Sequence, residues 1–370
     1  MRPSRPAWRG GVAAVLAAAL LSPVAPATAA PARSAGPLDT AFARAAGEFD
    51  VPRDLLIAVG YGETRLDGHD GRPSQANGYG VMHLVSNPHQ RSLERAAELT
   101  GQPVGALKSV TAANIRGGAA VLRDLADAER LTAADRDRIS AWYPVVARYA
   151  HAVDDATARL YADHVYNLLQ AGISTAAVRV APRRVRPELG RYGRVPVAGT
   201  PSRDAVAAAV PEYAPARWVS AYGGNYSPGR SSRITTVVVH VTQGSYAGTI
   251  SWFQNPSAGV SAHYVVRSSN GEVTQMVREG DTAYHARSAN PYSVGIEHEG
   301  FVDNPGWFTE SMYRSSAALT RYLCDKYGLP KNRTAIKGHH ELPGNDHTDP
   351  GPHWNWNYYV SLVNAGAGPG

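Results

Sequence analysis

The chain has 370 residues, 44% of them hydrophobic and 18% charged, and its formal net charge is +6. This length exceeds the usual size of one domain, so we expect two folded domains with sizeable apolar cores. Cys324 is the only cysteine, which excludes an intramolecular disulfide. Because it lies in an apolar helical pattern, we expect its thiol to be buried.

Residues 1–30 have the pattern of a secretory signal peptide. Three arginines precede an apolar run over about residues 12–21, and the small residues Ala27-Thr28-Ala29-Ala30 suit a cleavage site. The run is shorter than the ~20 residues that a membrane-spanning helix needs. We therefore expect a secreted protein without a transmembrane segment. Cleavage would remove three arginines and no acids, and would lower the formal charge from +6 to +3.

Residues 38–172 are rich in alanine, leucine and helix-compatible charged residues. They show no sustained strand pattern, which predicts an all-α domain. The expected helices span residues 38–48, 52–63, 93–100, 112–129 and 157–170.

Residues 173–212 are predicted to be an arginine- and proline-rich linker. Within them, residues 179–203 contain seven arginines, four prolines and three glycines against one acid, which is typical of an extended segment. Its charge would suit an anionic cell-wall polymer such as a polyphosphate, although a merely solvated linker is the preferred interpretation. No nucleic-acid recognition motif or aromatic platform accompanies the arginines, so nucleic acid is not an expected partner.

Residues 213–365 combine strand and helix signals. Such a mixture predicts an α/β domain with a mixed central sheet flanked by helices. The expected strands span residues 234–240, 262–266, 272–277 and 294–297, and a long amphipathic helix is expected over residues 310–327.

This domain also contains a set of possible metal ligands. His240 ends an apolar strand-like run, a position where α/β sheets commonly collect ligands, and His339 and Asp349 bracket a loop. Two imidazoles and one carboxylate can hold zinc tetrahedrally with one position open for water. A second carboxylate, Glu297 or Glu299, could then act as the base. Both lie on the same face of a strand, so spacing alone does not distinguish them.

Six short motifs follow one another in the domain. They are Val238-Val239-His240-Val241-Thr242, Val260-Ser261-Ala262-His263-Tyr264, Tyr284-His285-Ala286, Val294-Gly295-Ile296-Glu297-His298-Glu299-Gly300, Gly338-His339 and Thr348-Asp349-Pro350-Gly351-Pro352. In this order, over residues 213–365, they resemble the zinc-dependent N-acetylmuramoyl-L-alanine amidases of the amidase-2 type, which are related to the peptidoglycan recognition proteins. The resemblance implies a cell-wall enzyme with peptidoglycan as its partner. Its reaction would be hydrolysis of the amide between the lactyl group of N-acetylmuramic acid and L-alanine of the stem peptide, by a zinc-activated water.

The resemblance also implies roles for individual residues. One zinc ion per chain would be held by His240, His339 and Asp349, and Glu297 would be the acid and base. His347 stands where several relatives have a lysine that stabilises the developing oxyanion. A histidine can donate the same hydrogen bond, but its charge depends on pH near neutrality.

Two further histidines match motif positions. The resemblance suggests that His263 and His285 bind substrate along the groove or orient a ligand, although packing inside the domain is an equally supported interpretation.

The helical region contains a second candidate site. Glu63 ends a predicted helix and is followed by Asn77-Gly78-Tyr79-Gly80-Val81-Met82-His83-Leu84 and by Asn114-Ile115-Arg116-Gly117-Gly118-Ala119. Over residues 38–170 this order resembles the lysozyme-like fold of lytic transglycosylases, which implies Glu63 as a general acid kept protonated by burial.

Two positions depart from that pattern. His83 stands where glutamine is usual, and Arg148-Tyr149-Ala150 lacks the asparagine that commonly follows the tyrosine. Two alternatives to amide hydrolysis therefore stay open: glycan cleavage at Glu63 as a second or main activity, and non-catalytic peptidoglycan binding.

Overall fold

The computed structural model describes residues 36–197 and 210–366. The predicted signal peptide, residues 1–30, and residues 198–209 of the predicted linker lie outside these ranges. We call residues 36–197 the helical part and residues 210–366 the sheet part.

The helical part consists mainly of α-helices around an apolar core. The expected long helices are all present, with ends within two residues of those predicted. α2 lies in the centre of this core, because its residues from Leu55 to Gly60 are all buried. The helices are α1 (Pro37–Phe49), α2 (Arg53–Thr64), α3 (Ser92–Thr100), α4 (Val104–Ser109), α5 (Thr111–Ala128), α6 (Ala133–Arg136), α7 (Tyr143–Tyr149) and α8 (Asp155–Ala171). Short 3-10 helices span His69–Gly71, Ile139–Trp142 and Gly190–Arg194.

The helical part also contains two small antiparallel sheets. β1 (Gly78–Tyr79) pairs with β2 (Leu84–Val85), and β3 (Ile173–Ser174) pairs with β4 (Arg179–Val180). Two-residue strands are too short to give an alternating pattern, so sequence did not reveal them.

The prediction of an extended linker is wrong for residues 173–197. Residues 173–197 pack against the helices, and Ile173, Val178, Val180 and Tyr192 are buried in the core of the helical part. Burial of these apolar side chains between the arginines provides the driving force for this packing.

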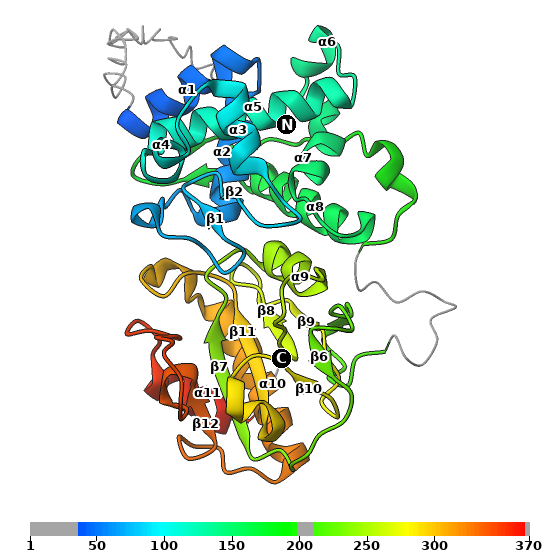
Figure 1. Cartoon of the computed structure of the whole chain (residues 1–370), viewed down its shortest axis with the longest axis vertical. Helices are drawn as coiled ribbons and strands as arrows, with labels where there is room; N and C mark the ends of the chain where they lie inside the picture. The colour runs from blue at the N-terminus through cyan, green and yellow to red at the C-terminus, as the bar shows by residue number, and fades with distance from the viewer. Residues whose placement is uncertain (1–35, 198–209, 367–370) are drawn as a thin grey trace, which may run out of the picture. The chain divides into compact units, whose positions relative to one another are not determined.

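The sheet part is built on a six-stranded mixed sheet, as predicted. Its strand order is β12-β7-β11-β8-β9-β5, and β11 lies between β7 and β8 (Figure 1). The first four strands in this order are parallel, β9 is antiparallel to β8, and β5 is parallel to β9. The strands are β5 (Arg217–Trp218), β7 (Thr236–Val241), β8 (Tyr264–Val266), β9 (Val273–Gln275), β11 (Ser293–His298) and β12 (Ile336–Gly338), with a separate pair of β6 (Tyr226–Ser227) and β10 (Thr282–Ala283). The helices are α9 (Tyr246–Gln254), α10 (Glu310–Tyr327) and α11 (Trp356–Asn364), with 3-10 turns at Arg287–Tyr292, Pro305–Trp307 and His339–Glu341.

Along the central strands, successive side chains point to opposite faces of the sheet, and only one of these faces packs against α10 and α11. Val237 and Val239 of β7 pack in one apolar cluster with residues of α10 and α11. His240 must therefore face the other side of the sheet. The parallel register sets Glu297 of β11 directly beside His240, on that same side. Cys324 on α10 is buried, as predicted.

The two parts touch through polar and aromatic contacts, and the described residues of both belong to one compact unit. The Arg65 guanidinium donates to Ser268 Oγ over 2.8 Å and lies 4.2 Å from the ring centre of Trp307. The His69 ring stacks on Phe301, with centroids 3.5 Å apart. These side chains of the helical part therefore pack against the sheet part.

Candidate active site

All three predicted zinc ligands, His240, His339 and Asp349, meet at the carboxyl end of the parallel strands. His240 is the last but one residue of β7, and His339 follows β12. These two strands are parallel neighbours, so both histidines lie at the same end of the sheet. The Asp349 carboxylate lies between them: its Oδ2 is 3.1 Å from His240 Nδ1, and its Oδ1 is 3.1 Å from His339 Nδ1. One ligand atom from each residue lies within 4.8 Å of the others.

The chemistry of this donor set fits zinc. Burial lowers the pKa of His240, which keeps its imidazole neutral, the form that binds metals. Burial would raise the pKa of Asp349, but hydrogen bonds from His240 and His339 outweigh it and hold that pKa well below its usual range. A carboxylate and two imidazoles, all buried, form a typical zinc donor set.

Glu297 lies next to these ligands and is buried. Its Oε2 has no hydrogen-bond partner among the described residues. Burial, followed by the negative charge of Asp349, raises its pKa well above the usual value. A buried carboxyl with a free oxygen is suited to accept and return a proton.

Glu299 has a different environment from Glu297. This difference distinguishes the two carboxylates, which their spacing in the sequence does not. Its Oε1 accepts a hydrogen bond from the Tyr246 backbone N–H over 2.9 Å, and its Oε2 accepts one from the Ser268 N–H over 2.7 Å. Both oxygens are therefore occupied in holding the start of α9 and a neighbouring loop.

His285 lines the cleft beside the ligands. Its Nδ1 is 2.9 Å from His240 Nε2, and its Nε2 is 3.2 Å from Ser293 Oγ. These contacts fix the orientation of the His240 ring and leave the Nδ1 of His240 directed at Asp349.

His263 does not line the cleft, so the prediction that it binds substrate is wrong. Its side chain is fully buried. Its Nδ1 accepts a hydrogen bond from the Gly295 N–H over 3.0 Å, and its Nε2 lies 2.6 Å from Arg230 Nη2. The residue packs inside the sheet part, where burial lowers its pKa to about 3.

His347 lies at the surface of the same site. Its ring stacks on that of His339 with centroids 4.2 Å apart, and its Nδ1 is 3.7 Å from Asp349 Oδ1. The side chain is 53% exposed, so it can meet a substrate that enters the cleft.

The cleft has a volume of about 800 Å³, and its lining includes His240, His285, Glu297, His339, His347 and Asp349. Residues 73–75 of the helical part also line it. Sequence reasoning missed this contribution, because nothing in the local pattern of residues 73–75 indicates contact with a strand far along the chain.

Glu63 is enclosed rather than open to a glycan. The cavity around it holds about 30 Å³, room for a water molecule or two but not for a sugar ring. Gly248, Ser251 and Trp252 of α9 contribute to its wall. Burial raises the pKa of Glu63 to about 7, as the lysozyme resemblance implies, but the residue lacks the access that glycan cleavage requires.

This pKa predicts a pH-dependent stability that Glu63→Gln should remove. Because the folded-state pKa of about 7 exceeds the ordinary 4.5, the folded protein binds more protons than the unfolded chain between these values. Its unfolding free energy should therefore fall as pH rises from about 5 to 8, by up to about 3 kcal/mol relative to the variant. Urea denaturation at several pH values measures this difference. Glu98→Gln, at an exposed position on α3, is the control, and identical pH profiles for wild type and Glu63→Gln would contradict the prediction.

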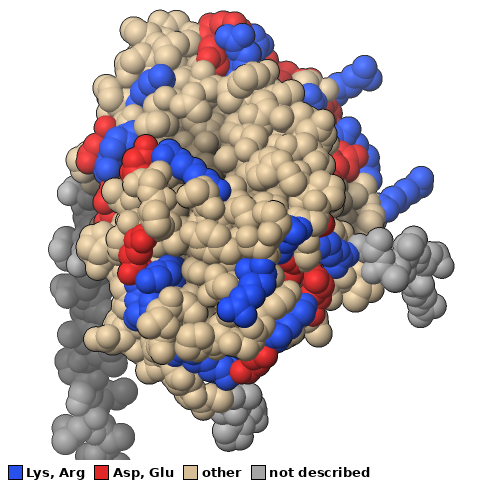
Figure 2. Space-filling view, turned by 60° about the horizontal axis from the view of Figure 1, so that its bottom comes forward, with Lys and Arg blue, Asp and Glu red and all other residues tan. Residues whose placement is uncertain are grey.

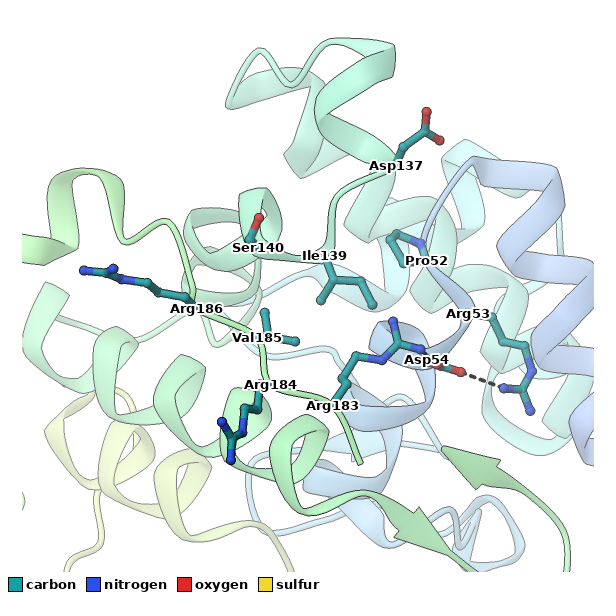
Figure 3. A pocket seen from close by; sticks show the side chains of 10 residues that line it. All are labelled: Pro52, Arg53, Asp54, Asp137, Ile139, Ser140, Arg183, Arg184, Val185 and Arg186. Carbon is teal, nitrogen blue, oxygen red and sulfur yellow. Dashed lines mark hydrogen bonds and ion pairs between the residues drawn. The ribbon is translucent and has the colours of Figure 1, made fainter. Parts of the chain in front are cut away.

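A separate hollow of about 630 Å³ lies in the helical part and is lined by Arg53, Arg183, Arg184 and Arg186 (Figure 3). Arg53 and Arg183 both pair with Asp54, whereas the side chains of Arg184 and Arg186 point away from the hollow in Figure 3. On the face drawn in Figure 2, basic and acidic residues lie interspersed. The hollow contains none of the residues of the metal-binding cluster.

The sequence of the chain is similar to those of known amidases. The family model for N-acetylmuramoyl-L-alanine amidase matches residues 230–352. N-acetylmuramoyl-L-alanine amidase A of Achromobacter lyticus is 41% identical over 174 residues, which cover 42% of this chain and 98% of that protein. The 1,6-anhydro-N-acetylmuramyl-L-alanine amidase AmpD of Haemophilus influenzae is 34% identical over 113 residues, which cover 28% of this chain and 59% of AmpD. A crystal structure of a selenomethionine AmpD derivative has 26% identity and a TM-score of 0.35, and the match covers 40% of this chain and 95% of that one. The match at 41% identity over 98% of the Achromobacter enzyme shows that this chain belongs to the N-acetylmuramoyl-L-alanine amidase family.

Proposed function

We propose that this amidase cleaves the bond between the lactyl group of N-acetylmuramic acid and L-alanine of the peptidoglycan stem peptide, using water activated at a zinc site. His240, His339 and Asp349 would hold one zinc ion per chain. The observation that carries the proposal is the free, buried carboxyl of Glu297 beside these three ligand residues in a cleft of about 800 Å³.

The zinc site, Glu297 and His347 would each have a separate role in the reaction. Zinc, when bound, supplies Lewis-acid polarisation of the scissile carbonyl and lowers the pKa of a coordinated water. Glu297 accepts a proton from the attacking water and later donates it to the leaving L-alanine nitrogen. His347 donates a hydrogen bond to the carbonyl oxygen as negative charge develops there. No covalent bond to the enzyme is needed.

Digestion of purified peptidoglycan, with products identified by mass spectrometry, tests this function. We expect intact stem peptides with free L-alanine amino ends. Anhydromuramic products would instead support glycan cleavage at Glu63, and the absence of both products would leave only peptidoglycan binding. A zinc-chelated sample is the control for the metal requirement.

The role of His347 predicts a specific kinetic defect. His347→Ala should lower kcat about tenfold or more, because a hydrogen bond to the developing oxyanion is lost, while KM and zinc content change little. His347→Lys should retain most of the activity. His353→Ala, at another exposed histidine, controls for general effects, and a wild-type kcat in His347→Ala would refute the role.

The location of the protein and the fold of the helical part complete the proposal. Secretion by a signal peptide at residues 1–30 would bring the enzyme to its cell-wall substrate. Among the described residues, none of the helices has the length and apolar character needed to cross a membrane. A lysozyme-like fold for the helical part, and contact of the arginine-rich segment of residues 179–203 with anionic cell-wall polymers, stay predictions.

A further inference from the structure

One wall of the amidase cleft comes from the helical part. Pro73 and Gln75 are exposed, Ser74 is buried, and all three line the cleft that contains the zinc-ligand candidates. The Gln75 backbone N–H donates to the Gln243 carbonyl over 3.2 Å. Gln243 is three residues beyond His240, so Gln75 is fixed close to the reacting groups.

The loop that carries Gln75 is held from behind by His83. Ser74 Oγ is 2.7 Å from His83 Nε2 and accepts a hydrogen bond from the Gly78 N–H over 3.0 Å. A side chain at position 78 would meet the His83 ring, because a Cβ there would lie 2.3 Å from His83 Nε2. His83 itself has φ = 50°, a left-handed conformation that is uncommon outside glycine. These hydrogen bonds and this close packing hold the loop in a defined position beside the cleft.

Behind His83 lies Glu63. His83 Nδ1 is 3.4 Å from Glu63 Oε2, and the same oxygen accepts a hydrogen bond from Ser245 Oγ over 3.1 Å. Ser245 is the N-cap of α9. The first backbone N–H of α9, that of Tyr246, donates to Glu299. The start of α9 is thus held by Glu63 on the helical side and by Glu299 on the sheet side.

We propose that the helical part completes the substrate cleft of the amidase: Gln75 contacts amide groups of the muramoyl-peptide substrate, and Glu63 positions this wall through His83 and Ser74. This inference rests on the proposed function. The side-chain amide of Gln75 has both a donor and an acceptor, which match the acetamido group and the peptide bonds of such a substrate. Glu63 is a positioning residue, since its closed cavity separates it from any substrate.

Steady-state kinetics on a soluble N-acetylmuramoyl-L-alanyl peptide tests the contact. Gln75→Ala should raise KM about three- to tenfold, as expected for loss of a hydrogen bond or two, with kcat within about twofold of wild type. Gln170→Ala is the matched control, because Gln170 is exposed on α8 and does not line the cleft. An unchanged KM in Gln75→Ala would overturn the proposal.

A pair of Glu63 variants tests the positioning role. Glu63→Ala should raise KM as Gln75→Ala does. Glu63→Gln should keep the wild-type KM, because a side chain of the same size and shape still contacts His83 Nδ1 and still accepts from Ser245 Oγ. Equal KM values for Glu63→Ala and wild type would overturn this role. Circular dichroism verifies that each variant is folded. If Glu63→Ala does not fold, His83→Ala decides the question, because it removes the link between Glu63 and Ser74 and should raise KM in the same way.

The outcomes separate this inference from the proposed function. A wild-type protein that releases no L-alanyl peptide would refute the proposed function itself. An active wild type with unaltered KM in Gln75→Ala would refute only the contribution of the helical part.

Discussion

Glu297→Ala is expected to lower the rate of stem-peptide release by about 10²–10⁴-fold, the usual contribution of a general acid–base group. The variant loses the carboxyl that takes the proton of the attacking water, while His240, His339 and Asp349 stay in place. Zinc content should therefore remain at that of the wild type. The measurement is kcat on a soluble muramoyl peptide, together with metal analysis of the dialysed protein.

Stability gives this prediction a second readout. Glu297 has a raised pKa because of burial and the charge of Asp349, so its ionised form is disfavoured in the folded, metal-free protein. Replacing it should leave the unfolding free energy unchanged or raise it at neutral pH.

Glu299→Ala is the matched control and should behave in the opposite way. It removes the acceptor for two buried backbone N–H groups, those of Tyr246 and Ser268, and should destabilise the fold by a few kcal/mol. Substantial activity in Glu297→Ala, or an inactive but fully stable Glu299→Ala, would contradict the assignment of the base to Glu297.

Asp349→Ala is expected to abolish both zinc binding and amide hydrolysis. The carboxylate lies between the two imidazoles, with one oxygen 3.1 Å from each Nδ1, so its loss removes a ligand and the group that orients the other two. Wild-type protein should retain about one zinc per chain after dialysis, and the variant should retain almost none. Atomic emission spectroscopy on both proteins measures this.

An acidic residue of the same loop provides the control for Asp349. Asp346 has a 74% exposed side chain and pairs with Arg287 over 2.7 Å. Asp346→Ala should keep its zinc and most of its activity. If Asp349→Ala retained zinc at the wild-type stoichiometry, the ion would be held by other residues, and the prediction would be wrong.

The sequence by itself predicted the elements whose signals are local. The β-branched run that ends at His240 indicated a buried strand with a ligand at its end, and β7 (Thr236–Val241) has that form. Helical periodicity located α10, because burial of one helical face repeats every three to four residues. The alanine- and leucine-rich composition without a strand pattern indicated α2 and α5. The order of short motifs also identified the amidase family, which the relatives show independently.

Only the tertiary structure showed which residues far apart in the chain lie in contact, and these contacts decide the roles of several site residues. Glu297 and Glu299 share one strand face, yet only Glu299 meets two backbone N–H donors, so only Glu297 keeps a free oxygen. His263 carries a family motif but is buried by neighbouring strands. Glu63 ends a helix as expected, but α9 covers it. Each outcome depends on contacts between residues far apart in the chain, and local propensity does not encode such contacts.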